Sequence, residues 1–166
     1  MSLLTEDDLL KNSKFKLRTL EEAENLAEFM ALHCHESKRI LPGLKALLVN
    51  AIEHGNLAIC KSHKNVLGNH KNWRREISRL LQLPHNQEKF VSATLSLTKR
   101  GVYIIIEDQG EGFDWEKFIH IDPARAGDHY GRGIALAHAM SFDKLVYNDK
   151  GNRAVAFVSN ERQLEW

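Results

Sequence analysis

Residues 91–108 read VSATLSLTKRGVYIIIED, and this stretch decides the fold class. Apolar side chains alternate with polar ones from Val91 to Leu97, which is the pattern of a half-buried strand. Residues 99–101 then turn the chain into a second run of β-branched residues that ends at Asp108. The stretch therefore predicts a β-hairpin, and the protein is expected to contain an antiparallel sheet.

The segments on either side of this hairpin supply helices and further strands. Apolar residues recur at helical spacing at about 19–33, 39–55, 73–81 and 134–140. Thr19 and Glu22 form a capping box that starts the first helix, and Pro42 suits only the first turn of the second. Strand-like alternation recurs at 15–19, 144–148 and 154–159. We expect an α+β fold with helices on one face of a mixed, mostly antiparallel sheet.

Composition favours one ordinary globular domain over 1–166. The chain has 23 basic and 22 acidic residues, so it lacks the basic excess that a nucleic-acid-binding protein usually carries. Its apolar runs fall well short of the roughly 20 residues that span a membrane. Acidic residues near the start do not suit a signal peptide, and Cys34 and Cys60 suit a reducing compartment. We expect a cytoplasmic protein with no nucleic-acid or membrane partner.

The first candidate motif lies on the helix expected at 39–55. Ala46, Asn50 and His54 are four residues apart, so they share one stripe with steps of about 6 Å. Gly43 and Ala46 are small and leave room for a ligand, beside an amide oxygen that could bind magnesium. An ordinary helix end, with Asn50 bonded to nearby backbone, explains the same residues.

The second motif follows the hairpin, where Asp108 precedes Gly110 and Gly112. Strand alternation directs Asp108 to the buried face, where a carboxylate needs a hydrogen-bond donor such as an adenine amine. The two glycines would let the backbone approach a flat base. An acidic β-turn without a ligand is the alternative.

The third motif is Gly131, Arg132 and Gly133 at the start of the helix expected at 134–140. Free backbone amides at a helix start attract anions, and Arg132 adds a positive charge. The segment between Trp115 and Tyr130 has little periodicity and the length of a lid over phosphates. A pair of glycines of this kind is weak evidence by itself.

In this order the three motifs resemble the N box and the two glycine boxes of GHKL ATPases. The anti-sigma-factor and serine-kinase branch is most similar, through residues 50–56, 113–115, 122–126, 131–134 and 151–152. The resemblance covers about 15–158 and implies a Bergerat-type two-layer α/β sandwich that binds ATP and magnesium. Related domains are often joined to regulatory modules, so the chain is compatible with being part of a longer protein.

The resemblance also implies a role for each matching residue. Asn50 would hold magnesium, and Asp108 would bind the adenine amine. Gly110 and Gly112 would shape the base pocket, while His54 and Arg132 would approach the phosphates, with the amides of Gly131 and Gly133 around them.

Two positions depart from the family pattern. Active members carry a glutamate four residues before the magnesium-binding asparagine, and this chain has Ala46 there. Loss of such a base costs roughly 10²–10⁴ in rate. Arg153 and Ala154 stand near the position where many relatives have a threonine. We therefore expect no catalytic base and weak or absent phosphoryl transfer.

Two function classes remain open. One is a nucleotide-loaded regulator that binds a sigma factor or an antagonist protein in partner switching, as a monomer or a homodimer. The other is an active ATP-dependent protein-serine kinase that phosphorylates the antagonist. A zinc site built from His33, Cys34, His35, Cys60 and His63 is a weaker reading, because the ligand spacing is not that of known zinc motifs.

Overall fold

The computed structural model describes residues 9–60, 70–119 and 132–161, with the side chains of Leu9 and Arg132 left out. Its sheet has five strands in the order β1-β2-β3-β5-β4. These are β1 (Leu9–Leu17), β2 (Val91–Thr98), β3 (Gly101–Glu107), β4 (Lys144–Tyr147) and β5 (Arg153–Ser159). Every described strand pair is antiparallel, so the expected mixed sheet is wrong and the α+β class is confirmed.

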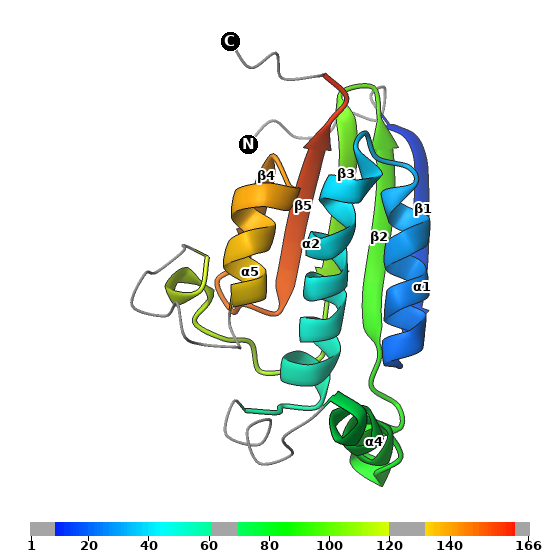
Figure 1. The fold of residues 1–166 in the computed structure, drawn as a ribbon, viewed down its shortest axis with the longest axis vertical. Coiled ribbons are helices and arrows are strands. Elements are labelled where there is room, and N and C mark those ends of the chain that lie inside the picture. The colour runs from blue at the N-terminus through cyan, green and yellow to red at the C-terminus, as the bar shows by residue number, and fades with distance from the viewer. Residues whose placement is uncertain (1–8, 61–69, 120–131, 162–166) are drawn as a thin grey trace.

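The helices form the second layer. They are α1 (Leu20–Ala31), α2 (Ser37–Asn50), α4 (His70–Leu81) and α5 (Arg132–Leu136). α2 and α5 continue as the π-helical segments η2 (Ala51–Asn56) and η6 (Ala137–Ser141), and the short 3₁₀ turns are η3 (Pro84–Asn86) and η4 (Trp115–Lys117). In Figure 1, α1, α2 and α5 lie side by side over one face of the sheet, whereas α4 lies across its lower end.

Local sequence signals explain how these elements begin. Thr19 accepts a hydrogen bond from the Glu22 backbone at 3.1 Å, and Glu22 accepts one from the Thr19 backbone at 3.0 Å, so the capping box is confirmed. β1 begins at Leu9 and ends at Leu17, earlier than expected. α2 begins at Ser37, which places Pro42 beyond the first turn, where its ring is exposed.

The core fills the space between the two layers. Alternate residues are buried as predicted from Val91 to Leu95 and from Val102 to Ile106. At the end of β2 the pattern shifts, so that Leu97 is half-buried while Ser96 and Thr98 are buried. The largest side chains with almost no exposed surface come from α1, α2, η2, α4 and the sheet: Met30, Ile40, Leu44, Leu48, Ile52, Ile77, Val91, Ile104 and Val158. The helix at 132–141 is not buried on every side, because Leu136 and Met140 are exposed.

α2 and η6 pack unusually closely. A Cβ atom on Gly43 would overlap the Ser141 side chain, so only glycine allows this spacing between the two helices. None of the helices within the described ranges is both long and apolar enough to cross a bilayer.

Candidate functional site

A cavity of about 460 Å³ opens where η2, the loop after β3 and the β4–β5 turn meet. Polar and small residues from α2, η2 and the loops line it: Asn50, Ala51, His54, Gly55, Asn56, Lys89, Asp108, Gly110, Glu111, Gly112, Gly151 and Asn152. Apolar and other residues complete its walls: Leu47, Ala58, Ile59, Cys60, Ile106, Phe113, Phe118, Ile134, Tyr147 and Ala154. Cavities of this size and mixed lining accept cofactor-sized ligands.

Asp108 occupies one end of this cavity, directly after β3. Its backbone amide donates to the carbonyl of Asn152 at 2.9 Å, and the Asn152 side chain donates back to the Asp108 carbonyl at 3.2 Å. The carboxylate accepts one hydrogen bond, from the Gly110 amide at 2.8 Å. The two hydrogen bonds with Asn152 fix the Asp108 backbone, and the Asp108 side chain retains capacity to accept from a ligand.

The pKa of the Asp108 carboxyl is raised to about 6, chiefly because the group is withdrawn from solvent. The Gly110 amide and the positive charge of Lys150 oppose this effect, while Glu107 adds to it. A carboxylate in an ordinary exposed turn would not experience such desolvation. Asp108 is half-buried beside η2 rather than exposed, which distinguishes it from the exposed acidic turn that the sequence also allowed.

Glycines surround Asp108 because larger residues would collide there. A Cβ atom on Gly55 would overlap the Asp108 carboxylate, and one on Gly110 would overlap the Gly55 carbonyl. Gly112 has a φ of 81° and faces the Lys150 carbonyl so closely that any side chain would clash. The loop after β3 thus lies directly against η2 and the β4–β5 turn.

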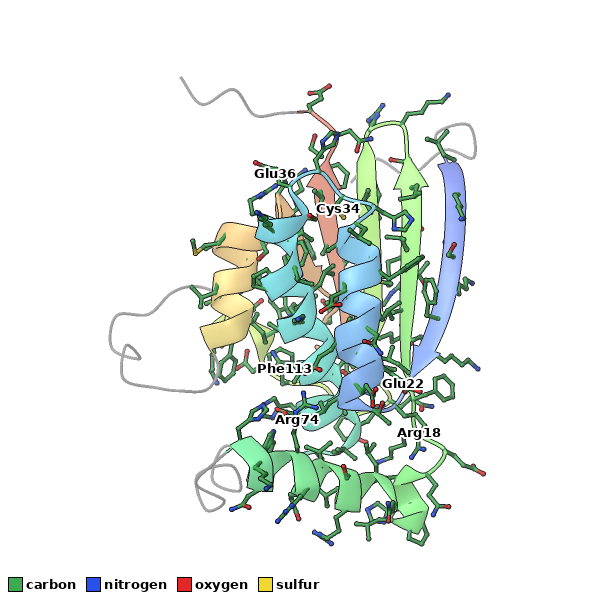
Figure 2. The ribbon with its side chains drawn as sticks, turned by 45° about the vertical axis from the view of Figure 1, so that its right-hand side comes forward. Arg18, Glu22, Cys34, Glu36, Arg74 and Phe113 are labelled. Atoms are coloured by element: carbon green, nitrogen blue, oxygen red, sulfur yellow. The ribbon has the colours of Figure 1, made fainter. Side chains whose placement is uncertain are left out.

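Aromatic rings close the side of the cavity formed by β4. Phe113 contacts Tyr147 edge-on, with ring centroids 5.3 Å apart, and Trp115 stacks on Tyr147 at 5.9 Å. Burial raises the pKa of the Tyr147 phenol, with a smaller contribution from Asp108. Such a wall provides flat apolar surface beside the polar end. Figure 2 shows Phe113 close to the lower end of the helical layer.

Near Asn50, which lines the cavity, the first and third motifs come together. A Cβ atom on Gly133 would lie 3.3 Å from the Ala46 Cβ and 4.0 Å from the Asn50 amide nitrogen. Lys45 turns the other way and pairs with Glu28 at 3.4 Å. The structure therefore brings Ala46, Asn50 and Gly133 together, and leaves only a methyl group at position 46.

His54 lines the cavity, but its ring is hydrogen-bonded to the backbone of the turn that follows η2. Nδ1 lies 2.6 Å from the Ile59 carbonyl oxygen and must donate to it, because a carbonyl only accepts. Nε2 lies 3.9 Å from the Glu53 carboxylate. His54 therefore holds the turn after η2, where Ala58 has a positive φ of 52°.

Part of the predicted site lies outside the described residues. Gly131 is one such residue, and so is the expected lid from His120 onward. Arg132 is described only as the backbone start of α5, and Trp115–Lys117 form a 3₁₀ turn at the beginning of the expected lid. Ala154, at the position of the missing threonine, does line the cavity and presents no polar group.

Sequence reasoning missed Tyr147 and Lys89 as lining residues. The alternation of β4 could have identified Tyr147, because it shares the inward face with buried Leu145. Lys89 gives no such signal, since it sits in the link before β2 and donates to the Asn56 carbonyl at 3.1 Å. Within the described ranges, no three His, Cys, Asp or Glu side chains form a group that could hold a metal ion.

Comparison with known proteins adds no assignment. No protein-family model matches the chain, and no curated protein matches it either.

Proposed function

We propose that the chain is an ATP-binding regulatory domain with a Bergerat-type fold, similar to the anti-sigma-factor and serine-kinase branch of GHKL ATPases. The observation that supports this most is the Asp108 carboxyl. It lines a cavity of about 460 Å³, glycines surround it, and its pKa is raised. A carboxylate in such a setting favours a ligand that donates hydrogen bonds, and the exocyclic amine of adenine is such a donor.

ATP fits the distribution of groups along the cavity. Asp108 would accept from the adenine amine, and the aromatic wall with Tyr147 would cover the base and sugar. The triphosphate would then extend toward Asn50 and the start of α5, where helix-start amides favour anions. Magnesium takes oxygen ligands and often combines one protein oxygen with phosphates and waters, so Asn50 could hold it there. Bound magnesium would neutralise phosphate charge.

Binding without efficient phosphoryl transfer is the better-supported form of this proposal. The acidic residues among the described lining side chains are Asp108 and Glu111, and both belong to the loop after β3 rather than to α2. Glu53 is buried and bonded to Trp73 at 2.5 Å, away from the cavity. With Ala46 at the base position, no described carboxylate of α2 can orient a nucleophile beside Asn50.

The proposed biological role is partner switching in the cytoplasm. The nucleotide-loaded domain would bind a sigma factor or an antagonist protein, and exchange of nucleotide would change which partner it holds. Active serine-kinase function remains the alternative, and its support is the resemblance alone.

The proposal can be tested by calorimetry with ATP, ADP and GTP in the presence of magnesium. We expect ATP and ADP to bind, and GTP to bind at least about tenfold more weakly, because guanine presents a carbonyl oxygen where adenine presents its amine. Absence of heat at millimolar ATP, or equal affinity for GTP, would reject the adenine-pocket assignment.

Cys60 provides an independent assay. It is exposed and lines the cavity, whereas Cys34 is buried and its thiol pKa is raised to about 11 by desolvation. A thiol reagent at neutral pH should therefore modify Cys60 first. Bound ATP should slow this modification, and a Cys60→Ser variant supplies the background rate.

A further inference from the structure

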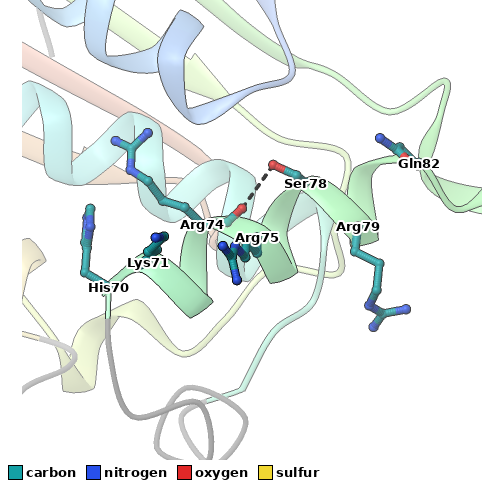
Figure 3. Close-up of a pocket in the computed structure, with 7 residues that line it drawn as sticks. All are labelled: His70, Lys71, Arg74, Arg75, Ser78, Arg79 and Gln82. Carbon is teal, nitrogen blue, oxygen red and sulfur yellow. Dashed lines mark hydrogen bonds between the residues drawn. The ribbon is translucent and has the colours of Figure 1, made fainter.

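The outer face of α4 concentrates positive charge that the overall composition conceals. α4 carries Lys71, Arg74, Arg75 and Arg79 against a single acidic residue, Glu76, in a chain with 23 basic and 22 acidic residues. Its exposed side forms an open hollow, whose described lining residues are His70, Lys71, Arg74, Arg75, Ser78, Arg79 and Gln82. Figure 3 shows these side chains along the helix.

Two of these four basic side chains form ion pairs within the protein, and the other two are available to bind a partner. Arg74 pairs with Glu24 of α1, and Arg79 donates to both carboxylate oxygens of Glu76 at 2.8 and 2.6 Å. Lys71 and Arg75 are exposed, and neither has an ion-pair partner among the described residues. They are four residues apart, so their charges lie on one stripe at a spacing of about 6 Å.

α4 is held rigidly enough to act as a platform. On its inner side Trp73 and Ile77 are buried, and the Trp73 indole donates to the buried Glu53 carboxylate. Near its end, the Arg18 guanidinium donates to the carbonyls of Leu81 at 2.9 Å and Asn86 at 3.2 Å. Figure 2 shows Arg18 and Arg74 at the junction between α4 and the rest of the molecule. A helix fixed in this way loses little backbone entropy when a partner binds to it.

We propose that the exposed stripe centred on Lys71 and Arg75 of α4 docks an acidic helical segment of a partner protein, with carboxylates at i, i+4 spacing. Carboxylates one helical turn apart match the spacing of the two free cations. This surface goes beyond the nucleotide site, and its binding does not require ATP.

Two other anionic partners fit less well. A lipid surface would need an exposed apolar face beside the charges, whereas the apolar side of α4 is buried in the protein. A nucleic acid would need more free cations or aromatic rings for stacking, and the aromatic residue of α4, Trp73, is buried.

The test measures binding of a fluorescent alanine-based helical peptide with glutamates at every fourth position, at about 20 mM salt and without nucleotide. We expect saturable binding that weakens as salt is raised. A peptide with glutamine in place of glutamate should not bind. The double variant Lys71→Glu/Arg75→Glu should weaken binding at least about tenfold, because each reversal replaces an attraction by a repulsion.

The matched control is Lys99→Glu/Arg100→Glu in the β2–β3 turn. It makes the same change in net charge on exposed residues, at the end of the sheet opposite α4 in Figure 1. It should change peptide affinity less than about twofold. Thermal melting checks that both double variants fold. If Lys71→Glu/Arg75→Glu does not fold, the milder Lys71→Gln/Arg75→Gln variant takes its place in the binding test.

Equal loss in both double variants, or binding of the glutamine peptide, would overturn the proposal. Tighter binding of random-sequence duplex DNA or of phosphatidylserine vesicles than of the acidic peptide would overturn it as well. ATP titration of the α4 variant distinguishes this result from failure of the nucleotide site, because α4 reversal should leave ATP affinity unchanged.

Discussion

Lowering the pH from 7.5 to 5 should weaken ATP binding through Asp108, whose ionised carboxylate accepts more strongly from the adenine amine than its protonated form does. The free protein holds this group with a pKa of about 6, because desolvation disfavours its charged form. The carboxyl is therefore nearly fully ionised at pH 7.5, about half ionised at pH 6 and about a tenth ionised at pH 5. The apparent dissociation constant should rise about fivefold to tenfold between pH 7.5 and 5.

The measurement is a calorimetric titration with ATP and magnesium at several pH values, compared with the Asp108→Asn variant. The phosphates of ATP also titrate near pH 6, and this contribution is common to both proteins. The variant retains an amide oxygen as acceptor but lacks the charge, so it should bind about tenfold more weakly at pH 7.5. Parallel pH profiles for the two proteins would refute the role assigned to Asp108.

The same carboxyl should give the free protein the opposite pH trend. Its folded pKa, about 6, lies above the ordinary 3.8, so the folded state binds this proton more tightly than the unfolded state does. Its contribution to stability is therefore present below about pH 4 and is lost as the pH rises through 6. After allowance for solvent screening we expect a loss of about 1–2 kcal/mol. Urea unfolding of the wild type against Asp108→Asn isolates this term.

Three further changes test other parts of the structure. Ala46→Glu should raise ATP hydrolysis at least about tenfold with little change in the ATP dissociation constant. A Cβ atom on Gly133 would lie 3.3 Å from the Ala46 Cβ, so the new side chain must point away from Gly133. Unchanged affinity without a gain in rate would show that more than the base is missing. Gly112→Ala should lower the free energy of unfolding by about 1–3 kcal/mol, because its φ is 81° and the Lys150 carbonyl blocks a side chain. The control is Gly133→Ala, where an added Cβ meets looser contacts, and it should lower the free energy of unfolding less in the same urea titration. Trp73→Phe should destabilise by about 1–3 kcal/mol by removing an N–H donor from buried Glu53, and a melting temperature equal to that of wild type would contradict this.

Local patterns predicted much of the fold because they report directly on which face of an element is buried. The hairpin at 91–107, the capping box of Thr19 and the helix containing Trp73 and Ile77 all follow from period and capping residues. Strand order and the wholly antiparallel sheet did not follow, because β5 pairs with β3 across about 50 residues of chain, and no local pattern encodes such a partner.

The candidate site was predictable to a similar degree. Asn50, Asp108, Gly110 and Gly112 do line one cavity, and Gly133 adjoins Asn50. The orientation of His54 was not predictable, because it depends on η2, where the helix widens and the ring turns toward the Ile59 carbonyl. The basic stripe on α4 was also missed, because overall charge balance hides a local excess.

The strongest reason to treat the cavity as a functional site is that the desolvated Asp108 carboxylate should lower the stability of the free protein at neutral pH. An acidic turn with no ligand would leave its carboxylate in solvent, whereas Asp108 is desolvated enough to raise its pKa to about 6. Gly112 and Gly151 both adopt a φ of 81°, and η2 interrupts regular helical bonding beside them. Glycine adopts such φ values at little cost, whereas desolvation of the ionised Asp108 carboxylate costs folding free energy that the core between α2 and the sheet must offset. A ligand that donates a hydrogen bond to Asp108 would recover part of that cost on binding, and this links the desolvated carboxylate to the proposed function.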